Sequence, residues 1–78
     1  MNSYILVNLD KETVIMEFTA ADEDAAISHV FSLYPRPPKH YGLYQIEIET
    51  DKNYNFQKKA KIIELPSEIT DDGDYIFN

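Results

Sequence analysis

The sequence contains no cysteine, only two glycines, and half as many basic residues (7) as acidic ones (14). The absence of cysteine excludes disulfides and cysteine-based metal sites, and it favours a reducing compartment. Two glycines cannot build a glycine-rich phosphate loop. No apolar run approaches membrane-spanning length. The segment 1–10 also lacks the basic start and long apolar core of a signal peptide. We therefore expect a soluble, cytoplasmic protein that does not bind membranes.

Groups that could carry catalysis are also scarce. The two histidines are separated, with His29 on the polar side of a predicted helix and His40 in a proline-rich loop. Neither has clustered ligands beside it in the sequence, so we expect no metal and no cofactor. The segment 71–74, DDGD, resembles part of a calcium loop but lacks the full ligand spacing and the final glutamate, which favours a turn. No serine lies in a nucleophile elbow. The chain is predicted not to be an enzyme.

The clearest pattern in the chain is a strand that runs into an amphipathic helix over residues 13–34. Asp22 is a good N-cap, and Glu23 and Asp24 place carboxylates at the positive end of the helix dipole. Pro35 ends the helix, because the residue before a proline is pushed out of the α region. At about 100° per residue, one side of the helix is apolar and is formed by Ala26, Ile27, Val30, Phe31, Leu33 and Tyr34.

Alternating apolar residues predict four strands around this helix, over residues 4–9, 13–20, 43–49 and 55–65. The order is ββαββ, an α+β fold. A right-handed crossover through the helix, followed by pairing of the third strand with the first, gives an antiparallel sheet of order 2-1-3-4 with one helix on one face. Residues 1–78 are then one domain, which ends in an acidic segment over 66–78.

The alternation also predicts which side chains face inward. In the last two strands we expect the core to contain Tyr44, Ile46, Ile48, Phe56, Ala60 and Ile62. On the side of the sheet away from the helix we expect an apolar patch formed by Tyr4, Leu6 and Ile15, extended by Ile63 or Leu65. Exposed apolar patches usually mark contact sites. We therefore expect self-association or a partner at Tyr4, Leu6 and Ile15.

Charge is the most informative feature of the composition, because a net charge of −7 and a pI near 4.5 disfavour direct nucleic-acid binding. Glu47 and Glu49 are expected to pair across strands with Lys59 and Lys61. Two acidic groups have no such basic partners in the sequence. The first is Asp22, Glu23 and Asp24, and the second is Glu64, Glu68, Asp71, Asp72 and Asp74.

These two acidic groups have two interpretations. The first is structural, with helix capping for one group and a solvated tail for the other. The second is a negative surface that docks on a basic, nucleic-acid-binding site of another protein. Tyr75, Ile76 and Phe77 favour an anchored tail, because apolar residues could form a short extra strand.

The proline loop, PRPPKHYG over residues 35–42, offers further candidate contacts. Residues 35–38 match the PxxP pattern of polyproline ligands, although a rigid spacer explains the same residues. Arg36 and Tyr41 are the residue types that anchor interfaces, so both are candidate partner-binding residues.

One short segment carries a resemblance. Phe18, Ala20, Asp22 and Ala26, within EFTAADEDAAI, resemble the strand-to-helix junction of many small phage-encoded α/β proteins. The size, acidity and missing catalytic motifs resemble small phage inhibitors, including anti-CRISPR and host-takeover proteins. The resemblance implies a non-catalytic inhibitor in the host cytoplasm that docks an acidic surface, as a nucleic-acid mimic, on a host protein or nucleoprotein complex. The alternative is an assembly module that forms a homodimer through the open sheet face.

Overall fold

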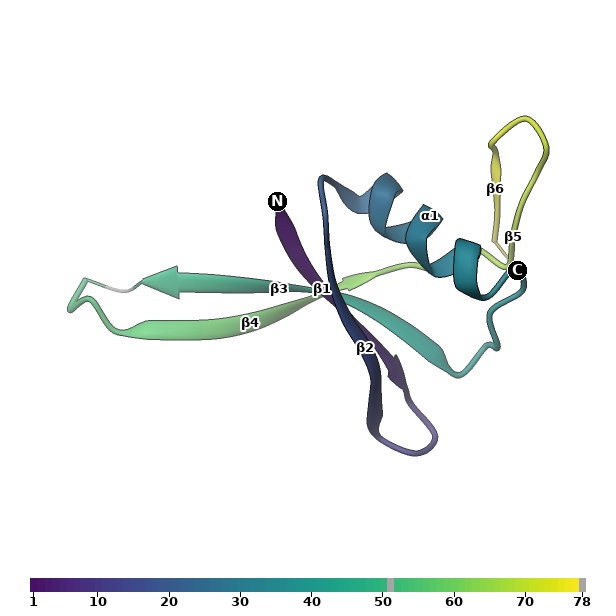
Figure 1. The fold of residues 1–78 in the computed structure, drawn as a ribbon. Helices are drawn as coiled ribbons and strands as arrows, with labels where there is room; N and C mark the ends of the chain where they lie inside the picture. Colours follow the sequence, from purple (N-terminus) through teal and green to yellow (C-terminus); the bar gives the residue numbers. More distant parts are fainter. Residues whose placement is uncertain (51, 78) are drawn as a thin grey trace.

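The computed structural model describes residues 1–50 and 52–77. Four strands form one antiparallel sheet of order β2-β1-β3-β4, and the helix α1 packs on one face of it, which confirms the predicted α+β fold (Figure 1). A small second sheet joins β5 and β6. The elements are β1 (Asn2–Asn8), β2 (Thr13–Ala20), α1 (Glu23–Leu33), β3 (Tyr41–Thr50), β4 (Phe56–Ile63), β5 (Glu68–Ile69) and β6 (Tyr75–Ile76).

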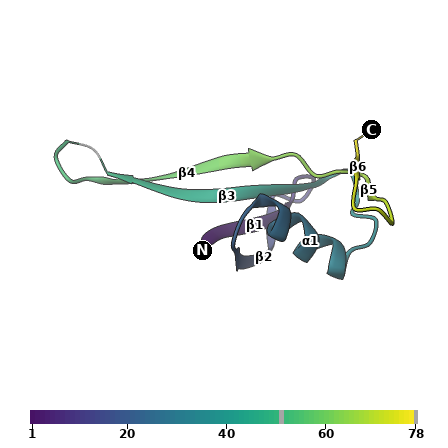
Figure 2. The ribbon, with the colours of Figure 1, turned by 90° about the horizontal axis from the view of Figure 1, so that it is seen from above.

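The β3–β4 hairpin is longer than the rest of the sheet. The pairing of β1 with β3 ends where Ser3 lies across from Ile46. The pairing of β3 with β4 continues to Thr50, which lies across from Phe56. Residues 47–50 and 56–59 therefore form a two-stranded arm, which projects beyond β1, β2 and α1 (Figures 1 and 2). Two-stranded hairpins have little stability of their own in water, so the arm depends on the sheet behind it.

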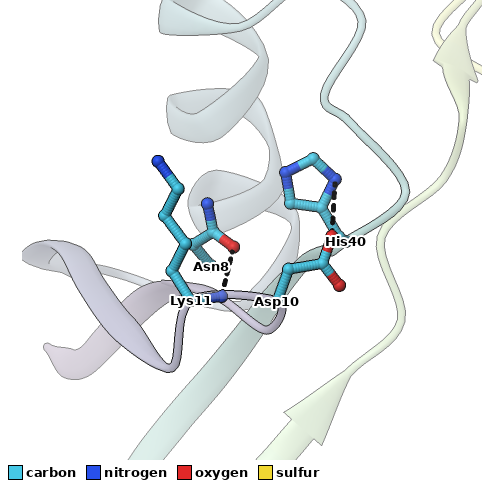
Figure 3. Close-up of polar contacts among 4 residues, drawn as sticks. All are labelled: Asn8, Asp10, Lys11 and His40. Carbon is cyan, nitrogen blue, oxygen red and sulfur yellow. Dashed lines mark hydrogen bonds and ion pairs between the residues drawn. The ribbon is translucent and has the colours of Figure 1, made fainter.

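The β1–β2 turn holds the start of β3 in place (Figure 3). The Asn8 side chain accepts a 3.1 Å hydrogen bond from the backbone N–H of Lys11, which closes the turn. The backbone N–H of Leu9 donates to the carbonyl of His40 at 2.8 Å, and the His40 ring lies 3.8 Å from the Asp10 carboxylate. These contacts join the proline loop to the first hairpin, and β3 begins at the next residue.

The helix begins as predicted. Asp22 is the N-cap, and its carboxylate accepts a 2.8 Å hydrogen bond from the backbone N–H of Ala25. The helix ends at Leu33, two residues before Pro35. Its buried residues are Ala26, Ile27 and Val30.

The apolar side of the helix is narrower than predicted, because Leu33 is 56% exposed. Phe31 and Tyr34, by contrast, are half-buried against the core. His29 lies on the predicted polar side of the helix but packs its ring against Phe18 of β2, with ring centroids 4.5 Å apart.

The helix covers the opposite face of the sheet from the one predicted. Tyr4 and Leu6 are 1% and 0% exposed and belong to the core, so the prediction of an exposed patch at these residues is wrong. Ile15 and Leu65 are half-buried against that core, and Ile63 is 5% exposed, so they do not form the patch either. The buried apolar residues of this core are Tyr4, Leu6, Ala20, Ala26, Ile27, Val30, Leu43 and Ile63.

The reason for this inversion is that both faces of the central strand are apolar. Tyr4 and Leu6 alternate with Ile5 and Val7, so period-two alternation finds the strand without deciding which row meets the helix. An 11-residue helix spans about 16 Å, while a ten-residue strand spans about 34 Å. The helix therefore covers only part of β3, and the row that begins at Leu43 continues into Gln45, Glu47 and Glu49.

The C-terminal segment is folded. As expected from Tyr75 and Ile76, it forms a short extra strand, because β6 pairs with β5. The backbone N–H of Ser67 donates to the carbonyl of Ile76 at 2.7 Å, and Gly73 takes the left-handed φ of 87° that the tip of the hairpin requires. The carboxylates of this hairpin are therefore carried on an ordered element.

Candidate functional site

The sheet has one face that the helix does not cover, and we call it the open face. The strand register defines this face. Ile5 of β1 lies directly across from Tyr44 of β3, and Tyr44 lies across from Ile62 of β4, so these side chains are on the same side of the sheet. In Figure 2 the helix lies on one side of β3 and β4, and their other side carries no helix. Its side chains are Ser3, Ile5, Val7, Val14, Glu17, Thr19, Tyr44, Ile46, Ile48, Thr50, Phe56, Lys58, Ala60 and Ile62.

Large apolar side chains on the open face are in contact with solvent. Ile48 is 64% exposed, Phe56 is 76% exposed and Ile62 is 74% exposed. These residues, with Tyr44, Ile46 and Ala60, were predicted to be core residues, and that prediction is wrong. A row of exposed apolar residues along one sheet face is typical of a surface that binds another protein.

Two hollows lie next to each other on this face. The first has a volume of about 460 Å³ and is lined by residues that include Ile5, Glu17 and Lys58. The second, of about 450 Å³, lies where the sheet meets the proline loop, and Tyr44 and Phe77 line it. They adjoin because Ile5 pairs with Tyr44 across the strands. Both are open to solvent rather than enclosed, which suits a protein surface better than a small molecule.

The open face is almost uncharged. In the strands, all of which the structure describes, only Glu17 of β2 and Lys58 of β4 place charged side chains on it. Both are exposed and both line the first hollow. The strands therefore place one charge of each sign on this face, and Lys39 and Glu64 line the second hollow beside them.

The acidic group at the helix start has partners, contrary to the prediction. Besides the capping role of Asp22, Glu23 accepts a 3.0 Å hydrogen bond from Lys61 of β4. Asp24 accepts a 2.9 Å hydrogen bond from the phenol of Tyr75. The hydrogen bond and the negative charge of Glu23 raise the pKa of Lys61. Structural contacts thus account for all three carboxylates.

The predicted cross-strand ion pairs form in part. Glu47 lies directly across from Lys59 in the register, as expected, but the ion pair of Lys59 is with Glu49, at 2.8 Å. This contact raises the pKa of Lys59 through the hydrogen bond and the charge of Glu49. Lys61 lies across from Gln45 and pairs with the helix at Glu23 instead. The helix-side face of the arm is therefore charged and solvated.

The C-terminal acids are arranged differently from those of the helix. All five are exposed, and within residues 1–50 and 52–77 no ion pair includes any of them. The ordered β5–β6 hairpin carries three of them on its turn. The five residues are Glu64, Glu68, Asp71, Asp72 and Asp74.

The two candidates from the proline loop do not form one site. Arg36 is exposed. Tyr41 is half-buried, and its ring meets Tyr34 edge-to-face at 5.4 Å and His40 at 5.2 Å. Tyr41 therefore packs the loop against the end of the helix, and it also lines the second hollow.

Sequence reasoning missed Glu17, Ile48, Phe56, Lys58 and Ile62 as site residues. The signal that could have found the open face was the length of the second hairpin. The apolar row in residues 44–62 runs much further than the helix can cover.

In the described part of the chain, no three histidine, cysteine, aspartate or glutamate residues lie close enough to hold a metal ion. No helix in that part is both long and apolar enough to cross a membrane. Comparison with known proteins found no family model, no curated protein and no solved structure that matches the chain.

Proposed function

We propose that this chain is a non-catalytic protein-binding module that docks through its open face. The observation that supports the proposal is the exposure of Ile48, Phe56 and Ile62 on one side of the β3–β4 hairpin. In a sheet with one solvated face, the side chains of each strand normally alternate, with apolar residues toward the core and polar residues toward water. Here the polar row faces the helix side, and the apolar row faces water.

The energetics indicate how much of the face a partner must cover. Burying the exposed part of Ile48, Phe56 and Ile62 contributes roughly 1–2 kcal/mol for each side chain. Association costs about 4–15 kcal/mol in lost translational and rotational freedom. The three side chains together contribute roughly 3–6 kcal/mol, which is below most of the range of this cost. A stable complex must also cover the β1 side of the face, around Ile5 and Tyr44.

Site-specific photo-crosslinking tests this proposal. Phe56 and Gln57 are neighbours on β4, both exposed, and they lie on opposite faces of the sheet. Benzoylphenylalanine placed at position 56 should form a covalent adduct with another protein chain, whereas the same group at position 57 should not. Equal yields at the two positions, or no adduct at position 56, would contradict the proposal.

A second candidate function is an inhibitor that docks an acidic surface on a basic, nucleic-acid-binding site of a host protein. The supporting observation is that Asp71, Asp72 and Asp74 are exposed on an ordered hairpin without ion pairs among the residues described. Held carboxylates attract a basic surface at long range and steer its approach. Salt separates the two functions, because charge-driven docking slows sharply at high ionic strength and apolar docking does not.

A further inference from the structure

We propose that the occupant of the open face is a second copy of this chain, packed face to face about a two-fold axis. This inference rests on the proposed function, because it names the partner that the open face binds. In such a dimer the open face of each copy covers the open face of the other, with β4 of one copy over β2 of the other. Two-fold interfaces use the same patch on both copies, so the patch must be complementary to itself.

The charges on the open face meet this condition. Glu17 lies on β2 and Lys58 on β4, at the two outer strands, and both line the same hollow. A two-fold axis that passes between them brings Lys58 of each copy onto Glu17 of the other. One positive and one negative charge therefore form two symmetric ion pairs. The geometry needs no third group to neutralise either side chain.

Net charge also favours this face over the rest of the surface. Each copy carries a net charge of −7, so two copies repel each other wherever acids predominate. The side chains that the strands place on the open face sum to zero, since Glu17 offsets Lys58. A strongly basic partner would find few carboxylates there, Glu17 on the strands and Glu64 at the second hollow. The open face is nearly neutral and its charges have opposite signs, so it suits a second copy better than a strongly basic partner.

Pairing along the sheet edge is less favourable than face-to-face packing. β4 is an edge strand, and two copies of it in antiparallel pairing would set Lys58, Lys59 and Lys61 against the same residues of the other copy. Lysines on an edge strand normally prevent such pairing. Like charges directly opposite on neighbouring strands are destabilising. The second copy is therefore placed on the face of the sheet.

The size of the face sets the expected strength. The four strands of the sheet contain 7, 8, 10 and 8 residues. At about 3.4 Å per residue and about 4.8 Å between strands, they give a flat footprint of roughly 540 Å². Side-chain relief makes the accessible area larger than this footprint. Standard interfaces bury about 800 Å² for each partner. The dimer therefore falls at the small end of stable interfaces, and its dissociation should be measurable.

Sedimentation equilibrium on charge-swapped variants tests the inference. The full chain is measured from about 1 μM to about 500 μM, together with Glu17→Lys, Lys58→Glu and the double variant. Both residues are exposed, so the fold should tolerate each change. Each single swap should weaken the dimer about tenfold or more, because it sets like charges against each other. The double swap should return the dissociation constant of the dimer to within about threefold of the parent value, because it restores both ion pairs at the same net charge.

A matched control is Gln57→Lys, which adds a positive charge to β4 on the helix-side face and should leave the dimer unchanged. A chain that stays monomeric at the highest concentration overturns the inference. If Phe56 then still crosslinks to a different protein, the proposed function stands and only the identity of the partner is wrong. If neither adduct nor dimer forms, both are wrong. A dimer that the double swap does not restore also overturns the Glu17–Lys58 pairing.

Discussion

The phenol of Tyr75 donates a 2.9 Å hydrogen bond to the carboxylate of Asp24, across 51 positions of sequence. Tyr75 lies in β6 and Asp24 in the first turn of α1. This contact joins the acidic C-terminal hairpin to the helix. The hairpin is thereby positioned by the same domain that forms the open face.

Removal of that hydrogen bond should loosen the hairpin. We expect Tyr75→Phe to lower the free energy of unfolding by about 0.5–1.5 kcal/mol, because the ring stays while the Asp24 contact is lost. Urea titration measures the change. Amide hydrogen exchange should show the loss of protection in β5 and β6 rather than in β1. Unchanged stability and unchanged exchange would mean that the contact is absent in solution.

The same residue makes stability depend on pH. Burial and the Asp24 contact raise the pKa of Tyr75 above its usual 10.0. The folded protein thus holds this proton more tightly than the unfolded chain. The resulting stability is complete below about pH 10 and is lost as pH rises through the higher folded pKa. Between about pH 9 and pH 11 the parent should lose more stability than Tyr75→Phe, and parallel losses would contradict the assignment.

The helix core gives a second prediction. Val30 is fully buried at the centre of the helix face, so Val30→Ala should lower the free energy of unfolding by about 1–3 kcal/mol. Ser32 lies on the exposed side of the same helix, and Ser32→Ala should be nearly neutral. Denaturant titration of both variants checks the orientation of the helix. Equal effects would mean that another side of the helix is buried.

The orientation of the sheet gives a third prediction. Leu6 is 0% exposed beneath the helix, so Leu6→Lys should destabilise the fold by more than about 3 kcal/mol. Ile62 is 74% exposed on the open face, and Ile62→Lys should change stability by less than about 1 kcal/mol. Thermal unfolding measures both. A folded Leu6→Lys with an unfolded Ile62→Lys would restore the opposite assignment of faces.

Local signals in the sequence predicted every element of the four-stranded sheet and its order. The Asp22 cap and Pro35 fix the helix ends, and alternation fixes the strands. The faces could not be predicted in the same way, because apolar residues occupy both rows of β1. What decides them is tertiary: the helix is shorter than the β3–β4 hairpin, so the longer apolar row remains uncovered.

The candidate site could be predicted only in part, as the fold could. Individual acidic residues could be identified from the sequence, but not their partners. Lys61 reaches Glu23 of the helix, 38 positions away, rather than a neighbouring strand. Contacts over such separations depend on how the helix lies across the sheet. The role of the C-terminal acids depends on a partner, and sequence and fold together show only that they are exposed.

The acidic hairpin gives a fourth prediction, which tests the second candidate function. We expect Asp71, Asp72 and Asp74 changed together to asparagine to leave the fold intact, because all three side chains are exposed. If the hairpin docks on a basic protein, that binding should weaken at least tenfold, about 1.4 kcal/mol. The loss should appear mainly as a slower association rate at low salt in stopped-flow measurements. Unchanged rates would make the hairpin a solvated structural element.

The central claim is that the helix leaves the open face uncovered and that this face associates. Isoleucine methyl signals, recorded with a soluble paramagnetic probe in dilute and in concentrated protein, test it most directly. In dilute protein, Ile48 and Ile62 should broaden strongly while Ile27 and Ile63 stay sharp, as their exposures require. In concentrated protein, Ile48 and Ile62 should become protected. Strong broadening of Ile27 and Ile63 in dilute protein, or equal broadening of Ile48 and Ile62 at both concentrations, would contradict the account.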